Sequence, residues 1–373
     1  MVYLDNAATT KMSPAALAAQ TRLSQEIFAN PSSLHAAGFA AEREVEAARA
    51  AIAAALNVKN EEIYFGAGGT FCNNTAIFGA ARANGRTKRR VVISNIEHAC
   101  VRESAMQLTS EGFEVIAVPP TVQDFAAAID GQTVLVSCML VNNETGLILP
   151  VEQIARAAHN AGALMHVDAV QAFGKMPVDA GALGADLLTI SAHKIHGPKG
   201  CGALYIKKGV RVRPIVFGGG QEKGMISGTL NSPAIAAFGA AVREMSAQLC
   251  ERKAHFAALE AHFLKQAADR KYLQLNRDAR PHAPHIINVS FMGYLGENVL
   301  HFLETKEIYV SVGSACSDHA HHGSILAAMG KDRKTVDGAL RISFGRETTK
   351  AEIDAFFAAA DEAEKTLIKK YRG

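Results

Sequence analysis

The fold of this chain is decided by one stretch, Asp186-Leu-Leu-Thr-Ile-Ser-Ala-His-Lys-Ile-His-Gly-Pro-Lys-Gly-Cys-Gly-Ala-Leu-Tyr205. Its apolar run to Ile190 predicts a buried strand, a Gly/Pro turn follows, and residues 202–206 predict a second strand. Lys194 comes just after the first of these strands. A lysine beside a Gly-Pro turn is most often a solvated loop charge, because burying an ammonium group is costly. The end of a buried strand also suits a reactive amine.

An earlier strand helps to decide whether Lys194 is a solvated charge or a reactive amine. Residues 163–170, Ala-Leu-Met-His-Val-Asp-Ala-Val, form an apolar run that carries Asp168 at its end, and Gln171 follows. Pyridoxal phosphate needs such a pair, a lysine for the Schiff base and a carboxylate that keeps the pyridine nitrogen protonated. Opposite charges about 4 Å apart interact by roughly 4 kcal/mol at an effective dielectric near 20. We therefore expect Lys194 and Asp168 to face one such ring.

The composition excludes several classes of protein. The 373 residues are 49% hydrophobic, which is ample for a core in two or three folding units. A formal net charge of +3 does not favour nucleic acid or an anionic membrane as a partner. We find no apolar run near the roughly 18 residues of a membrane span and no signal-peptide pattern. The six scattered cysteines contain no Cys-x-x-Cys pair, which argues against a zinc ribbon and for a reducing cytoplasm.

Strand and helix patterns alternate along the first part of the chain. The expected strands are 63–65, 91–94, 114–118, 134–141 and 163–170, with helical patterns between them. Such alternation predicts an α/β domain with a mostly parallel sheet flanked by helices, and polar residues at the strand ends predict a ligand site there. From residue 276 the pattern becomes α+β. We expect a large domain at 12–250 and a small domain formed by 1–11 and 251–373.

A glycine-rich loop, Gly66-Ala-Gly-Gly-Thr70, connects a strand to a helix. A dinucleotide-binding motif does not fit here, because Phe71 stands where the register needs glycine and no acidic residue follows at a suitable distance. The amides at the start of the helix, together with Thr70, can instead bind a single phosphate. One phosphate suits pyridoxal phosphate better than a pyrophosphate.

Taken together, the motifs resemble those of the cysteine desulfurases, fold-type-I pyridoxal-phosphate enzymes of the class-V aminotransferase family. The resemblance covers nearly the whole chain and depends on the order and spacing of the following segments: Tyr3-Leu-Asp-Asn-Ala-Ala-Thr-Thr10, Asn30-Pro-Ser-Ser33, Glu97-His98, Val141-Asn-Asn-Glu-Thr-Gly146, His166-Val-Asp-Ala-Val-Gln171, Ser191-Ala-His-Lys194, Ser227-Gly-Thr229, Gly313-Ser-Ala-Cys316 and Arg341-Ile-Ser-Phe-Gly-Arg346. It implies the fold of a pyridoxal-phosphate-dependent transferase and a homodimer.

This resemblance also implies a role for individual residues. Lys194 holds the cofactor and moves the α-proton of the substrate, Asp168 pairs with the pyridinium, and His98 stacks on the ring and takes part in catalysis. Arg341, helped by Asn30, binds the substrate carboxylate. The contacts to the phenolic oxygen and to the phosphate of the cofactor are assigned to Asn143, Gln171, Gly69, Thr70, Ser191, His193 and the partner subunit's Thr229.

Cys316 decides between desulfuration and transamination. Its neighbours Gly313, Ser314 and Ala315 are small, which suits a mobile loop. A thiolate there attacks the sulfur of cysteine bound to the cofactor, keeps it as a persulfide and releases alanine. A free thiol has a pKa near 8.5, so the site must lower it or relay the proton. The resemblance implies L-cysteine as substrate and, as sulfur acceptor, a scaffold or carrier protein for iron–sulfur assembly or thio-modification.

The sequence departs from the family pattern at several positions. Phe71 replaces an acidic residue, and Ile226 and Lys223 stand where arginine is common. The cluster His319, His321 and His322 follows Cys316; it is either a zinc or proton-relay site or, more simply, a solvated loop, and we assign no metal.

Two other functions stay open on the sequence alone. One is a lyase for selenocysteine or another β-substituted amino acid, and the other is a non-catalytic regulatory subunit that kept the fold. Retention of Lys194, Asp168, Arg341 and Cys316 together disfavours the second.

Overall fold

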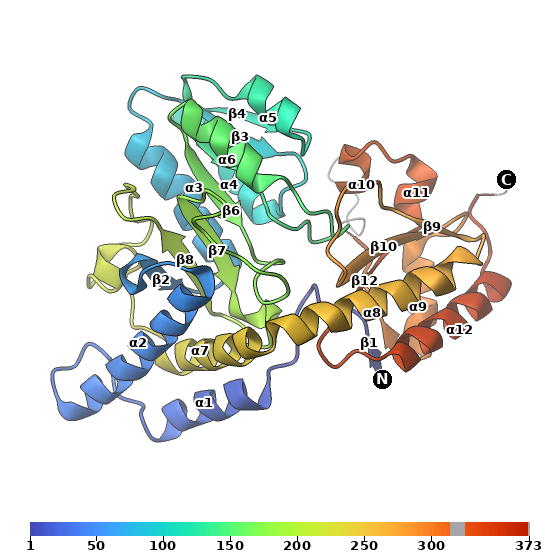
Figure 1. Cartoon of the computed structure of the whole chain (residues 1–373), viewed down its shortest axis with the longest axis horizontal. Coiled ribbons are helices and arrows are strands. Elements are labelled where there is room, and N and C mark those ends of the chain that lie inside the picture. The colour runs from blue at the N-terminus through green and yellow to red at the C-terminus, as the bar shows by residue number, and fades with distance from the viewer. Residues whose placement is uncertain (314–324, 372–373) are drawn as a thin grey trace. The chain divides into compact units, whose positions relative to one another are not determined.

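The computed structural model describes residues 1–313 and 325–371. They form two compact units, one built from 1–10, 141–148 and 250–373 and the other from 11–140 and 149–249. The described residues form one sheet in the larger unit and two in the smaller unit (Figure 1). Among the helices of the described residues, none is long and apolar enough to cross a membrane.

The larger unit is built on a seven-stranded sheet of order β2-β8-β7-β6-β5-β3-β4. All neighbouring strands in it pair in parallel except those on either side of β8. Because parallel strands end at the same edge, the last residues of β3, β5, β6 and β7 meet there. The strands are β2 (Ile63–Gly66), β3 (Arg90–Ser94), β4 (Glu114–Val118), β5 (Thr133–Ser137), β6 (Leu164–Asp168), β7 (Leu187–Ser191) and β8 (Gly202–Ile206).

Helices cover this sheet, and local sequence explains where they begin (Figure 1). Ser13 and Asn231 each accept a hydrogen bond from the third residue after them, and proline occupies the first turn of both helices, which favours a helix start there. The helices are α1 (Pro14–Gln25), α2 (Ala36–Leu56), α3 (Gly69–Asn84), α4 (Ala99–Gln107), α5 (Val122–Ala128), α6 (Val151–Asn160) and α7 (Ser232–Ala247), and the 3-10 turns are η1 (Asn60–Glu62), η2 (Leu108–Glu111), η3 (Ala192–Lys194) and η4 (Glu222–Gly224).

The smaller unit has a three-stranded antiparallel sheet, β12-β10-β9, and a parallel pair, β1-β11. Its core contains a cluster of packed phenylalanines, with the ring centroids of Phe263 and Phe357 4.8 Å apart and those of Phe356 and Phe357 5.2 Å apart. Its elements are β1 (Val2–Tyr3), β9 (Leu273–Leu275), β10 (Ile286–Phe291), β11 (Ile308–Tyr309), β12 (Ala339–Ser343), α8 (Leu249–Ala268), α9 (Gly296–Thr305), α10 (Ile325–Ala328), α11 (Arg333–Asp337) and α12 (Lys350–Thr366).

Two segments join the smaller unit from distant parts of the sequence. The N-terminal segment lies along β12, where Ala7 N–H donates to Ser343 Oγ (2.8 Å). The segment 141–148 was expected in the large domain, but it packs in the smaller unit, where Ala283 N–H donates to Gly146 O (2.7 Å). Gly146 has φ +73°, which favours glycine at this turn.

A single residue separates α7 from α8. The break falls at Gln248, whose backbone leaves the helical region (φ −110°, ψ 7°). Neither Gly nor Pro stands at this position, so no local sequence signal marks the break.

Candidate active site

Asp168 is the last residue of β6 and is 5% exposed. Its Oδ2 accepts a hydrogen bond from Asn73 Nδ2 (2.7 Å), and its Oδ1 accepts one from the backbone N–H of Val170 (2.9 Å). Asn73 lies on α3 and is itself buried. The carboxylate is therefore fixed in orientation at the carboxyl edge of the parallel sheet.

Lys194 ends the 3-10 turn that follows β7 and is half-buried. His193 is the residue before Lys194. Desolvation and the positive charges of Lys194, Lys175 and Lys199 lower the pKa of His193 to about 4. His193 is thus a neutral imidazole at neutral pH, able to accept or donate a hydrogen bond without adding charge.

His98 caps the start of α4. Its Nδ1 accepts a hydrogen bond from the backbone N–H of Cys100 (3.2 Å) and lies 3.0 Å from Cys100 Sγ. Desolvation lowers the pKa of His98, the charge of Asp168 raises it and that of Lys194 lowers it. Asp168 and Lys194 therefore both lie within electrostatic reach of this imidazole. Because Nδ1 accepts, we assign the proton of the neutral ring to Nε2.

The start of α3 has the features of a phosphate site. The residue before it, Gly68, has φ +128° and contributes no side-chain cap to the helix. A Cβ on Gly69 would lie 3.2 Å from Val170 Cγ2 and 3.9 Å from Ser191 Oγ. Ser191 Oγ is buried and finds no hydrogen-bond partner among the described residues. Buried hydroxyls are normally paired, so this one fits an oxygen of an anion at the helix start.

Together these residues fit pyridoxal phosphate. The larger unit offers a strand-end amine, a fixed carboxylate, a neutral imidazole and a phosphate cradle. Gln171 is buried just beyond Asp168, whereas Thr70, Thr229 and Asn30 lie exposed in the same unit.

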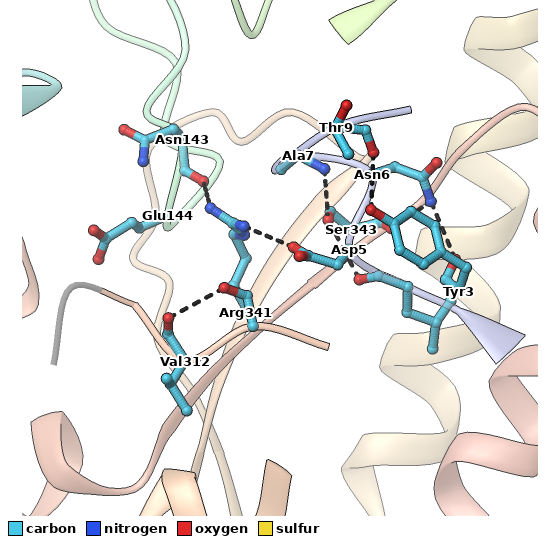
Figure 2. A network of polar contacts seen from close by, with 12 residues as sticks. Tyr3, Asp5, Asn6, Ala7, Thr9, Asn143, Glu144, Val312, Arg341 and Ser343 are labelled. Carbon is cyan, nitrogen blue, oxygen red and sulfur yellow. Dashed lines mark hydrogen bonds and ion pairs between the residues drawn. The ribbon is translucent and has the colours of Figure 1, made fainter. Parts of the chain in front are cut away.

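Arg341 lies in the smaller unit, on β12, and is 7% exposed. Its Nη2 donates to Asp5 Oδ1 (2.7 Å) and its Nη1 donates to the backbone oxygen of Asn143 (3.0 Å), as Figure 2 shows. Its Nε is buried without a partner among the described residues. The guanidinium is thus held from two sides and keeps N–H groups that suit a carboxylate.

Residues 311–313, which precede Cys316 in the sequence, begin beside this arginine. Arg341 N–H donates to Ser311 O (2.7 Å). A Cβ on Gly313, two residues after Ser311, would lie 2.7 Å from Glu144 Oε2, so an alanine there would have to displace the Glu144 carboxylate. Cys316 itself lies outside the described residues, as do His319, His321 and His322.

Sequence reasoning missed several residues of these two sites. Asn73 is three positions after Thr70 on α3, a spacing that places both on one helix face but does not reveal the strand it meets. Asp5 and Glu97 stood in the quoted motifs without a role. Glu97 is 1% exposed and accepts a hydrogen bond from Met139 N–H (2.7 Å). Burial and the charge of Asp168 raise the pKa of Glu97 to about 8.

Comparison with known proteins assigns the class. Residues 2–356 match the family model described as aminotransferase class-V. The chain belongs to this family, whose members depend on pyridoxal phosphate.

Within the family, the similar proteins are cysteine desulfurases. The mitochondrial cysteine desulfurase of Candida albicans is 40% identical over 373 residues, covering 97% of this chain and 76% of the relative. A solved NifS-like protein superposes with a TM-score of 0.92 at 34% identity, covering 98% of this chain and all of that one. SspA, solved in complex with cysteine, gives a TM-score of 0.80 at 31% identity and covers 92% of this chain and 99% of its own. The chain is a member of the cysteine desulfurase group.

Proposed function

We propose that this chain is a pyridoxal-phosphate-dependent cysteine desulfurase, which converts L-cysteine to L-alanine and takes the sulfur atom onto Cys316. The observation that carries the proposal is that the carboxylate of Asp168, held by Asn73, and the amine of Lys194 lie at the carboxyl ends of two adjacent parallel strands, β6 and β7. An amine, a buried carboxylate and a neutral imidazole in one place suit this cofactor. Similarity to cysteine desulfurases, and to a protein solved with cysteine, supports the substrate.

The residues of the larger unit would bind and orient the cofactor. Pyridoxal phosphate, when bound, supplies an electron sink for the substrate Cα. Lys194 would hold it covalently and carry the proton taken from Cα. Asp168, fixed by Asn73, would keep the pyridine nitrogen protonated, and His98 would cover the ring with its proton on Nε2.

Polar groups around the ring would complete the cofactor site. The phosphate would bind the amides at the start of α3 and the hydroxyl of Ser191, which finds no partner among the described residues. The further contacts that we propose are those of Gly69, Thr70, His193, Gln171, Asn143 and the partner subunit's Thr229.

Arg341 would bind the carboxylate of L-cysteine, with Asn30 in support. The Cys316 thiolate would then attack the substrate sulfur. A sulfur–sulfur bond forms as the Cβ–Sγ bond of the substrate breaks, and the electron pair of that bond goes to Cβ. A proton delivered to Cβ, and the return of the Cα proton by Lys194, complete L-alanine, and Cys316 keeps the persulfide. Its later acceptor would be a scaffold or carrier protein for iron–sulfur assembly or thio-modification.

A homodimer in a reducing compartment, the cytoplasm, is part of the proposal. Three exposed apolar side chains of the larger unit, Phe28, Leu34 and Phe217, are 76%, 88% and 82% exposed, which favours burial against another chain. The cysteines of the described residues are free thiols, which fits a reducing environment.

Alanine release from L-cysteine in the presence of a thiol reductant tests the proposal. We expect steady turnover in the wild type, and loss of turnover in both Cys316→Ala and Lys194→Ala. Only Lys194→Ala should also lose the visible absorbance of the bound cofactor. Turnover that persists in Cys316→Ala would reject sulfur transfer through this thiol.

A further inference from the structure

Asp5 is the one acidic side chain that the described structure pairs with Arg341. The Nη2–Oδ1 distance is 2.7 Å, and the arginine and aspartate side chains are 9% and 20% exposed. A guanidinium this buried needs a countercharge, and Asp5 supplies it from the opposite end of the chain. The remaining described contact, from Nη1 to the backbone oxygen of Asn143, is neutral (Figure 2).

The N-terminal segment is built to hold Asp5 in this place. Asp5 forms a parallel bridge with Ser343 on β12, two residues beyond Arg341. Asn6 Nδ2 donates to Ser343 O (3.1 Å), and a Cβ on Gly345 would lie only 2.3 Å from Asn6 Oδ1. Ser343 N–H also donates to Leu4 O (2.7 Å), so the backbone is fixed on both sides of Asp5. The carboxylate is therefore presented to Arg341 by a rigid segment and not by a free terminus.

The charges of Asp5 and Arg341 both affect the pKa of the nearby Tyr3 phenol. Desolvation raises the pKa of Tyr3, the charge of Asp5 raises it further, and the charge of Arg341 lowers it. Tyr3 Oη donates to Thr9 O (3.1 Å) and so adds no charge to the pair at neutral pH. Among the described residues, the charged groups that shift the pKa of Tyr3 are thus Asp5 and Arg341.

We propose that Asp5 sets the affinity of the active site for amino-acid carboxylates by sharing the guanidinium of Arg341 with them. The inference rests on the proposed function, in which Arg341 binds the substrate carboxylate. When the substrate binds, two carboxylates face one guanidinium, and their mutual repulsion weakens binding of the second. The unpaired Nε and the remaining Nη protons of Arg341 leave room for a two-point contact that does not displace Asp5. Asp5 is in this sense a positioning residue that also limits how tightly the product L-alanine is held.

The variant Asp5→Asn separates charge from shape. It keeps an oxygen that can accept from Arg341 Nη2, but it removes the negative charge. We expect the dissociation constant of L-alanine from the holoenzyme to fall about tenfold, or about 1.4 kcal/mol. Isothermal titration calorimetry measures the constant, and the rise in melting temperature on adding L-alanine measures it independently.

A matched ligand and a matched variant complete the experiment. L-Alaninamide lacks the carboxylate, so its affinity should be the same in wild type and Asp5→Asn. Asp354→Asn removes one negative charge from the surface of the same unit, where Asp354 contacts His262, and should leave L-alanine affinity unchanged. Asp5→Ser, also neutral, serves if Asp5→Asn does not fold, and should tighten L-alanine binding in the same direction.

The inference is overturned if the folded neutral variants bind L-alanine as weakly as the wild type or more weakly. It is also overturned if L-alaninamide gains as much as L-alanine. None of these measurements needs sulfur chemistry. A carboxylate-specific gain in a protein that never takes sulfur from cysteine would therefore uphold the inference and reject the desulfurase proposal.

Discussion

The buried ion pair between Arg49 and Glu222 gives a large and measurable prediction. Glu222 is 2% exposed at its side chain and accepts from Arg49 Nη2 (2.7 Å), from Arg49 Nη1 (3.0 Å) and from Phe65 N–H (2.7 Å). The pair connects α2 and β2 to η4, in the segment 217–229 that also contains Thr229. Glu222 has φ +50°, so the loop is strained where the pair holds it.

Replacing Arg49 by Met leaves the Glu222 carboxylate buried with one backbone donor. Removing one partner of a buried pair costs about 3–5 kcal/mol of the free energy of unfolding. In the double variant Arg49→Met/Glu222→Leu no charge stays buried, and the main loss is the acceptor for Phe65 N–H, about 1–3 kcal/mol. We therefore expect the double variant to be more stable than Arg49→Met alone.

Urea unfolding measures these differences in the free energy of unfolding. Far-ultraviolet circular dichroism is a suitable signal because the chain contains no tryptophan. The matched control is Arg82→Met, which breaks the half-exposed pair with Glu111 and should cost at most about 1 kcal/mol. If Arg49→Met is no less stable than Arg82→Met, or if the double variant is less stable than Arg49→Met, our reasoning about this pair is refuted.

Two further predictions concern a buried acid and a glycine. The pKa of Glu97 is raised from 4.5 to about 8, mainly by burial, with the charge of Asp168 adding to it, so its folded state binds more protons than the unfolded one between these values. The wild type should accordingly lose stability as pH rises from 4.5 to about 8, by at most about 1.4 kcal/mol per pH unit relative to Glu97→Gln. Urea unfolding at several pH values measures this, and an equal dependence of the unfolding free energy on pH in the two proteins would contradict it. Gly313→Ala should slow persulfide formation without weakening cofactor binding, because the new methyl group meets Glu144, whereas Gly131→Ala, with open space around it, should be neutral in a rapid-quench assay.

The sequence predicted the strand-end residues of the larger unit because two short-range signals define them. A buried strand ends where apolar residues give way to turn residues, and Asp168 and Ser191 are the last residues of β6 and β7. The same rule places Lys194 in the turn directly after β7. Since parallel strands end at one edge, their approximate proximity follows from the topology.

Other contacts were beyond the reach of sequence patterns because they depend on tertiary packing. Arg341 and Asp5 are separated by 336 positions, and their contact arises only when the N-terminal segment lies along β12. Asn73 reaches Asp168 because α3 packs across the sheet in one particular register. The segment 141–148 joins the smaller unit through main-chain bonds that no side-chain pattern indicates.

The most direct test of the central claim is mass spectrometry of the intact protein after brief exposure to L-cysteine without reductant, followed by peptide mapping. We expect one added sulfur atom on Cys316 in the wild type and none in Lys194→Ala. Alanine formation with no added sulfur on Cys316, or with the sulfur on another cysteine, would contradict it.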